Sequence, residues 1–325
     1  MASMNTGNMD LLTRTELWSA TLKESLKDDL FATTWVDMIV DFPDGNQFTI
    51  PSIGDAQVSD YVEGQAVTYR PRDTGEFVFT IDEYLQSGDS ITEKAMQDSF
   101  YAEKLMARFV PDQNRAIMEH FEATTLQKGE AVLGATPNGG YIINNARHRV
   151  SGGNAGRIEV ADFAYARYAL QKANVPMTNL VAIVDPSVEF TMNTLSNLVS
   201  LSDNPMWEGI VKDGISTGMR FVKNIYGFDV YVSNYLPTVT DSALPERDGT
   251  TTNNFSSVNG KANYFFSAAG GDILPWKAAW RQPPKVDYKF DQDFQEHRWV
   301  TTTRYGVKLY RPENLVSIVT NPNVS

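Results

Sequence analysis

The chain has 325 residues, of which 42% are hydrophobic and 11% aromatic, and it carries a formal net charge of −12. A chain of this length and hydrophobicity can bury a large core, which excludes disorder of the whole chain. The absence of cysteine excludes disulfides, thiolate metal sites and thiol catalysis. The acidic balance argues against generic binding of nucleic-acid phosphates. The longest purely apolar run, Leu180 to Val184, is too short for a membrane helix.

The negative charge is concentrated at the start of the chain. Residues 1–100 hold 18 acidic and 6 basic side chains, whereas acids and bases balance in the remainder. Two interpretations are open: a solvated acidic face, or an arm and loop region that faces a partner surface.

The first third of the sequence predicts an arm followed by a long β-flap. Residues 11–31 have the apolar spacing of an amphipathic helix with little else to pack against. Apolar residues then alternate from Val36 to Phe42, a turn follows at Pro43–Asn46, and strands are predicted at Phe48–Ile50 and Phe77–Ile81. The flap has too few apolar residues for a core of its own, so we expect it to need a neighbouring surface.

A long helix is predicted after the flap. Ser90 and Glu93 have the spacing of a capping box, and helical periodicity then continues to Lys128. Pro111 is expected to interrupt or kink this helix, and Gly129 is expected to end it.

The rest of the chain predicts an α/β unit followed by strands. Residues 131–158 contain no acid and many glycines, which indicates irregular loops. A helix is predicted at 159–174, a buried strand at Leu180–Val184, a helix opening at Asp185–Pro186, and a hairpin turn at Tyr226–Gly227. Four late strands are predicted: Val286–Phe290, Trp299–Thr303, Tyr305–Tyr310 and Leu315–Val319.

A search for catalytic chemistry finds one formal match. Residues 214–218 satisfy the GxSxG pattern of serine hydrolases, with Ser216 as nucleophile and His297 downstream. The motif requires a strand before it and a helix after it, but residues 219–223 have the pattern of a strand. We therefore favour a flexible loop before the hairpin. The histidines lack metal-ligand spacing, and no phosphate-binding loop is present, so we assign no catalytic, cofactor-binding or metal-binding residue.

The order of these elements resembles the major capsid proteins of tailed bacteriophages, which have the Hong Kong 97 fold. The segments that carry the resemblance are GFDVYVSN at residues 227–234, YGVKLYRPENLV at residues 305–316, and Val175–Pro176 followed by the Leu180 strand and Asp185–Pro186. The resemblance covers nearly the whole chain, and its weight lies in the order and spacing of the motifs.

The resemblance implies an α+β fold of the Hong Kong 97 type with five parts. These are an N-terminal arm (1–35), an extended β-loop (36–82), a peripheral domain (83–157) whose spine helix covers about 90–128, an α/β axial domain (158–284), and C-terminal strands (285–325) that return to the peripheral and axial core.

The implied function is that of a major capsid protein, not an enzyme, which assembles with itself into pentamers and hexamers of an icosahedral head shell. Scaffolding, portal and decoration proteins are implied further partners, and the enclosed DNA would be bound without sequence specificity. The implied location is the virion, after assembly in the host cytoplasm, with no membrane association. Two alternatives are an encapsulin-like nanocompartment shell and a serine hydrolase that uses Ser216.

Charge suggests where copies of the chain meet. The flap carries eight acids between Asp37 and Glu76 against only two arginines, and the acid-free segment supplies arginines as a candidate complement. Candidate assembly contacts are therefore Arg70, Arg72, Asp73, Glu76, Arg147, Arg149 and Arg157.

Overall fold

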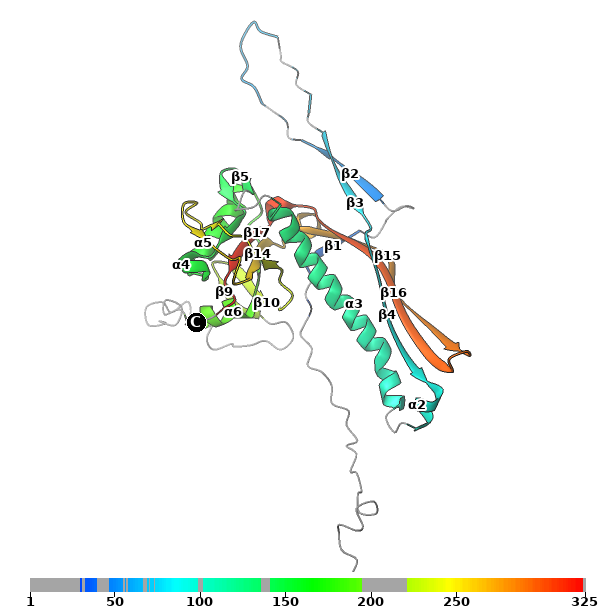
Figure 1. The fold of residues 1–325 in the computed structure, drawn as a ribbon. Coiled ribbons are helices and arrows are strands. Elements are labelled where there is room, and N and C mark those ends of the chain that lie inside the picture. The colour runs from blue at the N-terminus through cyan, green and yellow to red at the C-terminus, as the bar shows by residue number, and fades with distance from the viewer. Residues whose placement is uncertain are drawn as a thin grey trace, which may run out of the picture.

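The structure is a computed structural model. It describes residues 30, 33–39, 47–54, 56, 58–66, 69, 71–72, 74–98, 102–135, 141–194 and 221–323. The predicted turn at residues 43–46 lies outside them, as does the predicted arm helix except for Leu30. The described part has the mixed helix and sheet organisation that the sequence predicted, with two larger sheets and a projecting hairpin (Figure 1).

The larger sheet has seven strands in the order β7-β17-β14-β8-β10-β9, with β11 paired to β14. Its strands are β7 (Arg149–Ser151), β8 (Leu180–Val184), β9 (Phe221–Ile225), β10 (Phe228–Val232), β11 (Thr238–Val239), β14 (Gly260–Ser267) and β17 (Val316–Thr320). All residues of β8 and β17 are buried because both strands lie inside the sheet. The predicted hairpin turn is confirmed: Tyr226 and Gly227 have φ values of 52° and 87°.

Two helices cover one face of this sheet. Helices α5 (Val160–Lys172) and α6 (Pro186–Thr194) share a buried cluster with alternate residues of β8. The predicted helix opening is confirmed, since the Asp185 carboxylate accepts a hydrogen bond from the Ser187 backbone N–H at 3.0 Å. Glu159 and Asp162 form a capping box at the start of α5.

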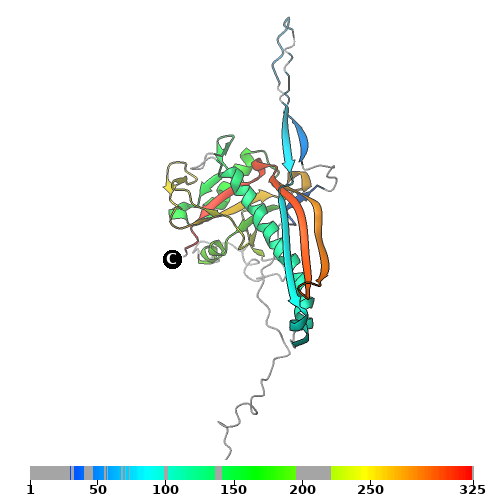
Figure 2. The same ribbon diagram turned by 45° about the vertical axis from the view of Figure 1, so that its right-hand side comes forward.

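The smaller sheet has four strands in the order β1-β15-β16-β4. These are β1 (Val36–Met38), β4 (Glu83–Thr92), β15 (Trp276–Asp291) and β16 (Glu296–Leu309). Strands β15 and β16 form a long hairpin that extends away from the larger sheet (Figure 2). Helix α3 (Ala102–Leu133) lies along this sheet, where Phe109 packs against Trp299 with ring centroids 5.5 Å apart.

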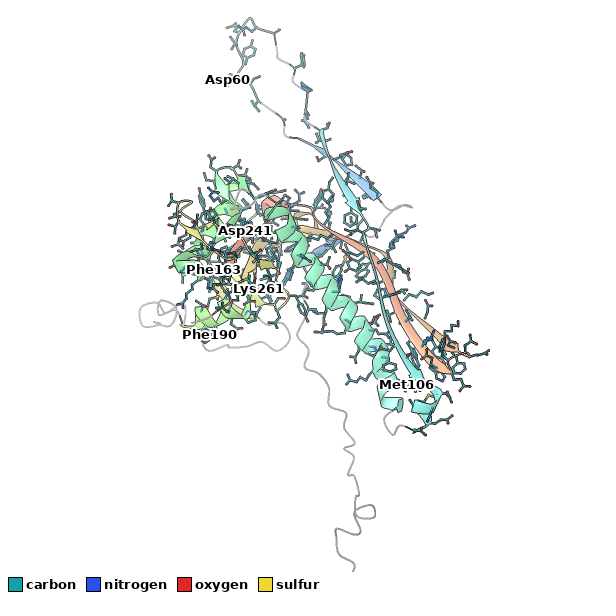
Figure 3. The ribbon with its side chains drawn as sticks, viewed as in Figure 1. Asp60, Met106, Phe163, Phe190, Asp241 and Lys261 are labelled. Atoms are coloured by element: carbon teal, nitrogen blue, oxygen red, sulfur yellow. The ribbon has the colours of Figure 1, made fainter. Side chains whose placement is uncertain are left out.

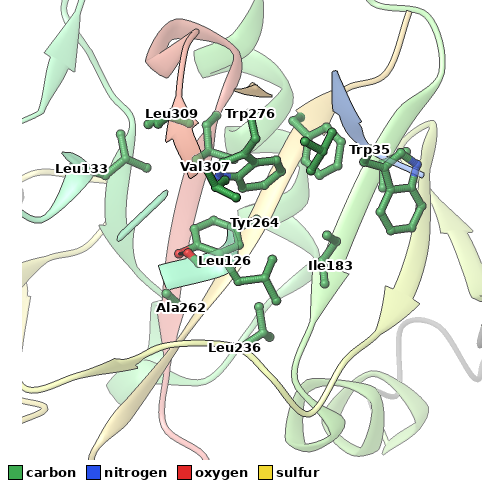
Figure 4. Close-up of a cluster of buried hydrophobic side chains, with 14 of the residues drawn as sticks. Trp35, Leu126, Leu133, Ile183, Leu236, Ala262, Tyr264, Trp276, Val307 and Leu309 are labelled. Carbon is green, nitrogen blue, oxygen red and sulfur yellow. Dashed lines mark hydrogen bonds between the residues drawn. The ribbon is translucent and has the colours of Figure 1, made fainter. Parts of the chain in front are cut away.

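The main core lies where the second half of α3 meets both sheets (Figure 4). Trp276, at the start of β15, packs edge-on against Tyr264 and Phe266 of β14, with ring centroids 5.8 and 5.4 Å apart. Trp35, directly before β1, packs against Tyr231 and Phe266. Aromatic side chains therefore join the two sheets.

The predicted capping residue of the long helix, Ser90, is wrong by two residues. Strand β4 continues to Thr92, so the first helical segment is α2 (Glu93–Asp98). The Thr92 hydroxyl accepts a hydrogen bond from the Ala95 backbone N–H at 3.3 Å. Ser90 pairs with Arg298 of β16 instead of capping a helix. Long-range strand pairing thus overrides the local capping signal.

The predicted end of the helix is also wrong. Helix α3 is continuous through Pro111 and Gly129 and ends at Leu133. A Cβ atom at Gly129 would lie 3.2 Å from Leu315 Cδ2 and 3.4 Å from the Trp276 ring. This glycine therefore allows close approach of the helix to the core instead of terminating it.

The structure differs from the strand predictions in three ways. Strand β1 pairs in parallel with the start of β15, from Val36↔Trp276, and is not part of the flap hairpin. The predicted strands at 299–303 and 305–310 form one continuous strand, β16. Strand β15 begins ten residues before the predicted start at Val286.

Candidate assembly surfaces

The flap is a hairpin of β2 (Gln47–Ile53) and β3 (Thr74–Thr80) that projects from the body of the molecule (Figures 1 and 2). Beyond the paired strands, Val58, Tyr61 and Tyr69 are 94%, 82% and 91% exposed. Apolar side chains this exposed gain nothing from their own subunit, and such patches typically mark contact surfaces.

The root of the flap is supported within its own subunit. Phe79 and Ile81 are buried against Ala279 of β15, with Phe48 and Phe77 packed partly buried around them. The expectation that the flap depends only on a neighbour is therefore wrong for its root. It stays a prediction for the exposed tip.

The structure describes two of the four predicted contact residues in the flap. Arg72 and Glu76 are exposed, whereas Arg70 and Asp73 lie outside the described residues. Figure 3 shows Asp60 near the far end of the flap and Asp241 in the body of the molecule, well apart. Asp241 lies 2.5 Å from Arg149, so Asp60 does not reach that arginine within one subunit.

Arg149, one of the predicted assembly contacts, is buried within its own subunit. Its side chain is 2% exposed, and its Nη2 and Nη1 atoms lie 2.6 Å from Glu130 Oε1 and 2.5 Å from Asp241 Oδ2. The charge is therefore used inside the subunit, where it joins β7 to α3 and to the segment after β11. Burial raises the pKa of the Glu130 carboxyl, and the Arg149 charge opposes that rise.

For the other two arginines of the acid-free segment, Arg147 and Arg157, a role as assembly contacts remains a prediction. Arg147 is partly buried, and its backbone N–H donates to the Tyr165 hydroxyl at 3.1 Å. Arg157 is exposed on the connection before α5.

Arg247, Asp162 and Glu159 form a second internal ion-pair cluster, which was not predicted from the sequence. Arg247 Nη1 lies 2.7 Å from Asp162 Oδ1, and its Nη2 lies 2.7 Å from Glu159 Oε2. Burial raises the pKa of Asp162, against hydrogen bonds from Glu159 N–H and Arg247 that lower it. The cluster holds the polar insertion after β11 against the start of α5. A separation of about 85 residues leaves no local signal for it.

The described residues do not complete the hydrolase motif. Ser216 lies outside them. His297, on β16, has Nε2 2.9 Å from Glu93 Oε2 and Nδ1 2.5 Å from the Tyr288 hydroxyl, so both ring nitrogens are engaged. The hydrogen bond with His297 lowers the pKa of Glu93.

Neither a metal centre nor a membrane span is found in the part of the chain that the structure describes. No group of three or more histidine, aspartate or glutamate side chains there is arranged to hold a metal ion. No helix among the same residues is long and apolar enough to cross a membrane.

Solved structures of phage capsids share this fold. The capsid of cyanophage P-SCSP1u superposes with a TM-score of 0.71 at 15% identity, covering 97% of this chain and 94% of that chain. A structure from Mycobacterium phage Che8 gives 0.66 at 18% identity, covering 96% and 98%. The capsid of Ralstonia phage GP4 gives 0.63 at 12% identity, covering 96% and 97%. At these identities the likeness concerns the fold.

The sequence itself matches no protein of curated function. It does match a sequence family described as phage capsid protein, over residues 75–318, from the second strand of the flap to the last strand of the larger sheet. On this match, which spans well over half of its length, the chain belongs to the phage capsid protein family.

Proposed function

We propose that this chain is the major capsid protein of a tailed phage, the coat subunit whose copies assemble into the head shell around the genome. The observation that carries the proposal is the flap, whose tip exposes Tyr61 and Tyr69 almost fully while its root is buried. A projecting hairpin of this kind is stable in an assembly in which a second copy covers its tip.

We further propose the finer assignment to the Hong Kong 97 type. In this assignment the β2–β3 hairpin is the extended loop, α3 is the spine helix, the four-stranded sheet belongs to the peripheral domain, and the seven-stranded sheet forms the axial domain. Copies would form pentamers and hexamers in the host cytoplasm. Scaffolding, portal and decoration proteins are further proposed partners, and the enclosed DNA is held without sequence-specific contacts.

The test is assembly of the purified protein, alone and together with a candidate scaffolding protein. We expect large symmetric particles in negative-stain images and in light scattering. A stable monomer under every condition, scaffold included, would contradict the proposal. Particles filled with a cargo enzyme instead of DNA would favour a nanocompartment shell. Ester hydrolysis that is lost on Ser216→Ala would favour the hydrolase alternative.

A further inference from the structure

The last part of β16 presents different residues on its two faces. Tyr305, Val307 and Leu309 are buried in the main core. Successive side chains of a strand point to opposite faces, so Gly306 and Lys308 lie on the other face. Tyr310 continues the same alternation directly after the strand. The flap root crosses this second face.

Gly306 marks the point where the crossing is closest. A Cβ atom there would lie 2.5 Å from the Thr80 backbone oxygen and 3.0 Å from Ile81 Cα. Both are backbone atoms, which cannot rotate away as a flexible side chain can. The end of β3 therefore rests directly on a position where only glycine fits.

Lys308 and Tyr310, the next two residues on this face, contact β3 closer to the flap tip. Lys308 Nζ donates a hydrogen bond to the Val78 backbone oxygen at 2.7 Å and lies 5.2 Å from the centroid of the Phe77 ring. The Tyr310 ring packs edge-on against Phe77, with centroids 4.9 Å apart. Gly306 and Lys308 of β16, and Tyr310 directly after it, thus contact the flap root between Phe77 and Ile81.

Two hollows adjoin the root of the flap. Their volumes are about 620 Å³ and 210 Å³, and Thr80 and Asp82 line both of them. The Asp82 carboxylate is tied to Lys128 of α3 at 2.9 Å, but this pair is partly exposed and contributes little. Beside the apolar cluster with Ala279 of β15, the contacts with the end of β16 are therefore the close contacts that orient the root among the described residues.

We infer that Gly306, Lys308 and Tyr310 form a saddle that fixes the direction in which the flap leaves the subunit. They are positioning residues for the flap, and they lie in β16 and directly after it, next to residues of the main core. The direction of the flap determines where its exposed tip meets the next copy, and this consequence for the shell rests on the proposed function.

The absence of cysteine allows a direct test. Thr74→Cys on the flap and Gln127→Cys on α3, both exposed, accept spin labels, and the distance between them is measured by electron paramagnetic resonance in dilute, unassembled subunits. We expect one narrow distance distribution in the otherwise unchanged chain. Lys308→Met keeps the apolar stem but removes the donor and the charge, so we expect a broadened or shifted distribution.

Lys285→Met is the matched control, because Lys285 is exposed on the same sheet and its ion pair with Asp287 does not involve the flap. It should leave the distribution unchanged. Phe77→Leu alters the same contact from the flap side and keeps the test valid if Lys308→Met fails to fold. An unchanged distribution in Lys308→Met, or in Phe77→Leu where the first variant does not fold, overturns the saddle.

The shell readout separates this inference from the proposed function. If the unaltered chain assembles, Lys308→Met should give shells of abnormal size or open sheets, whereas Lys285→Met should give normal shells. Normal shells from Lys308→Met together with an unchanged spin-label distance would contradict the saddle alone. Failure of the unaltered chain to assemble would contradict the proposed function and leave the spin-label test intact.

Discussion

Arg149 and Glu130 form a buried ion pair between β7 and α3, with Arg149 Nη2 2.6 Å from Glu130 Oε1. The same guanidinium also forms an ion pair with Asp241, so one cation neutralises two carboxylates. The pair connects the seven-stranded sheet to the helix that runs along the four-stranded sheet. An arginine that the sequence presented as a surface contact is therefore part of what holds the two halves of the subunit together.

Removing this cation should destabilise the subunit strongly. Arg149→Met keeps most of the side-chain volume but leaves Glu130 and Asp241 without their partner, and breaking a buried pair in this way costs about 3–5 kcal/mol. Denaturant unfolding of unassembled subunits measures the change. The exposed Arg157→Met is the control and should cost less than about 1 kcal/mol. Equal losses in the two variants would contradict the assigned role.

Acid should weaken the subunit through His148. This side chain is fully buried, its Nδ1 lies 3.0 Å from the Leu315 backbone oxygen, and burial lowers its pKa although Leu315 and Glu313 oppose the shift. The unfolded chain takes up a proton here near pH 6.5, whereas the folded chain does so only at lower pH. Stability should therefore fall as the pH drops below about 6.5, until the folded pKa is reached.

The variant His148→Asn tests this dependence, because its amide can still donate to the Leu315 carbonyl but does not titrate. Its unfolding free energy should vary less between pH 7 and pH 5 than that of the unaltered protein. A pH profile that His148→Asn leaves unchanged would assign the acid sensitivity to other groups.

Local signals in the sequence predicted local structure well. The apolar run at Leu180–Val184, the Asp185–Pro186 start and the Tyr226–Gly227 turn each depend on a few neighbouring residues, and all three are confirmed. The errors arise where a distant partner decides. Ser90 is in a strand because β16 pairs with it. Gly129 lies inside a helix, and its small size matters because Trp276 and Leu315 crowd that position.

Some features of the candidate assembly contacts were visible in the sequence, and others depend on residues far away along the chain. The excess of acid in the flap and its lack of a core were visible in composition, and the exposed tip agrees with them. The burial of Arg149 could not be predicted from composition, because its partners Glu130 and Asp241 lie 19 and 92 residues away along the chain. The saddle at Gly306 and Lys308 was equally hidden, since an alternating strand does not reveal what crosses its second face.

The start of α2 should depend on Thr92 and not on Ser90. The Thr92 hydroxyl caps the helix through Ala95 N–H, and replacing such a cap with alanine costs about 0.5–2 kcal/mol. Helix α2 is short and has no buried residue, so the loss should appear as faster amide hydrogen exchange in residues 93–98. Ser90→Ala, on the exposed face of β4, should leave this exchange unchanged. The opposite order would restore the capping box predicted from the sequence.

Assembly should depend on the exposed aromatic rings of the flap tip. Tyr61 and Tyr69 are 82% and 91% exposed, and burying one aromatic side chain at an interface contributes roughly 1.5–3 kcal/mol. The double substitution Tyr61→Ser and Tyr69→Ser removes no packing within the subunit, so circular dichroism and the melting temperature of unassembled subunits should not change. Shell formation should require a higher protein concentration, because each contact between copies loses this burial and the loss repeats around the shell. Tyr61→Phe with Tyr69→Phe keeps the rings and should assemble at nearly the unaltered concentration. Normal assembly of the serine variant, measured by light scattering over a concentration series, would show that the tip remains in solvent after assembly and that copies are held together by other surfaces.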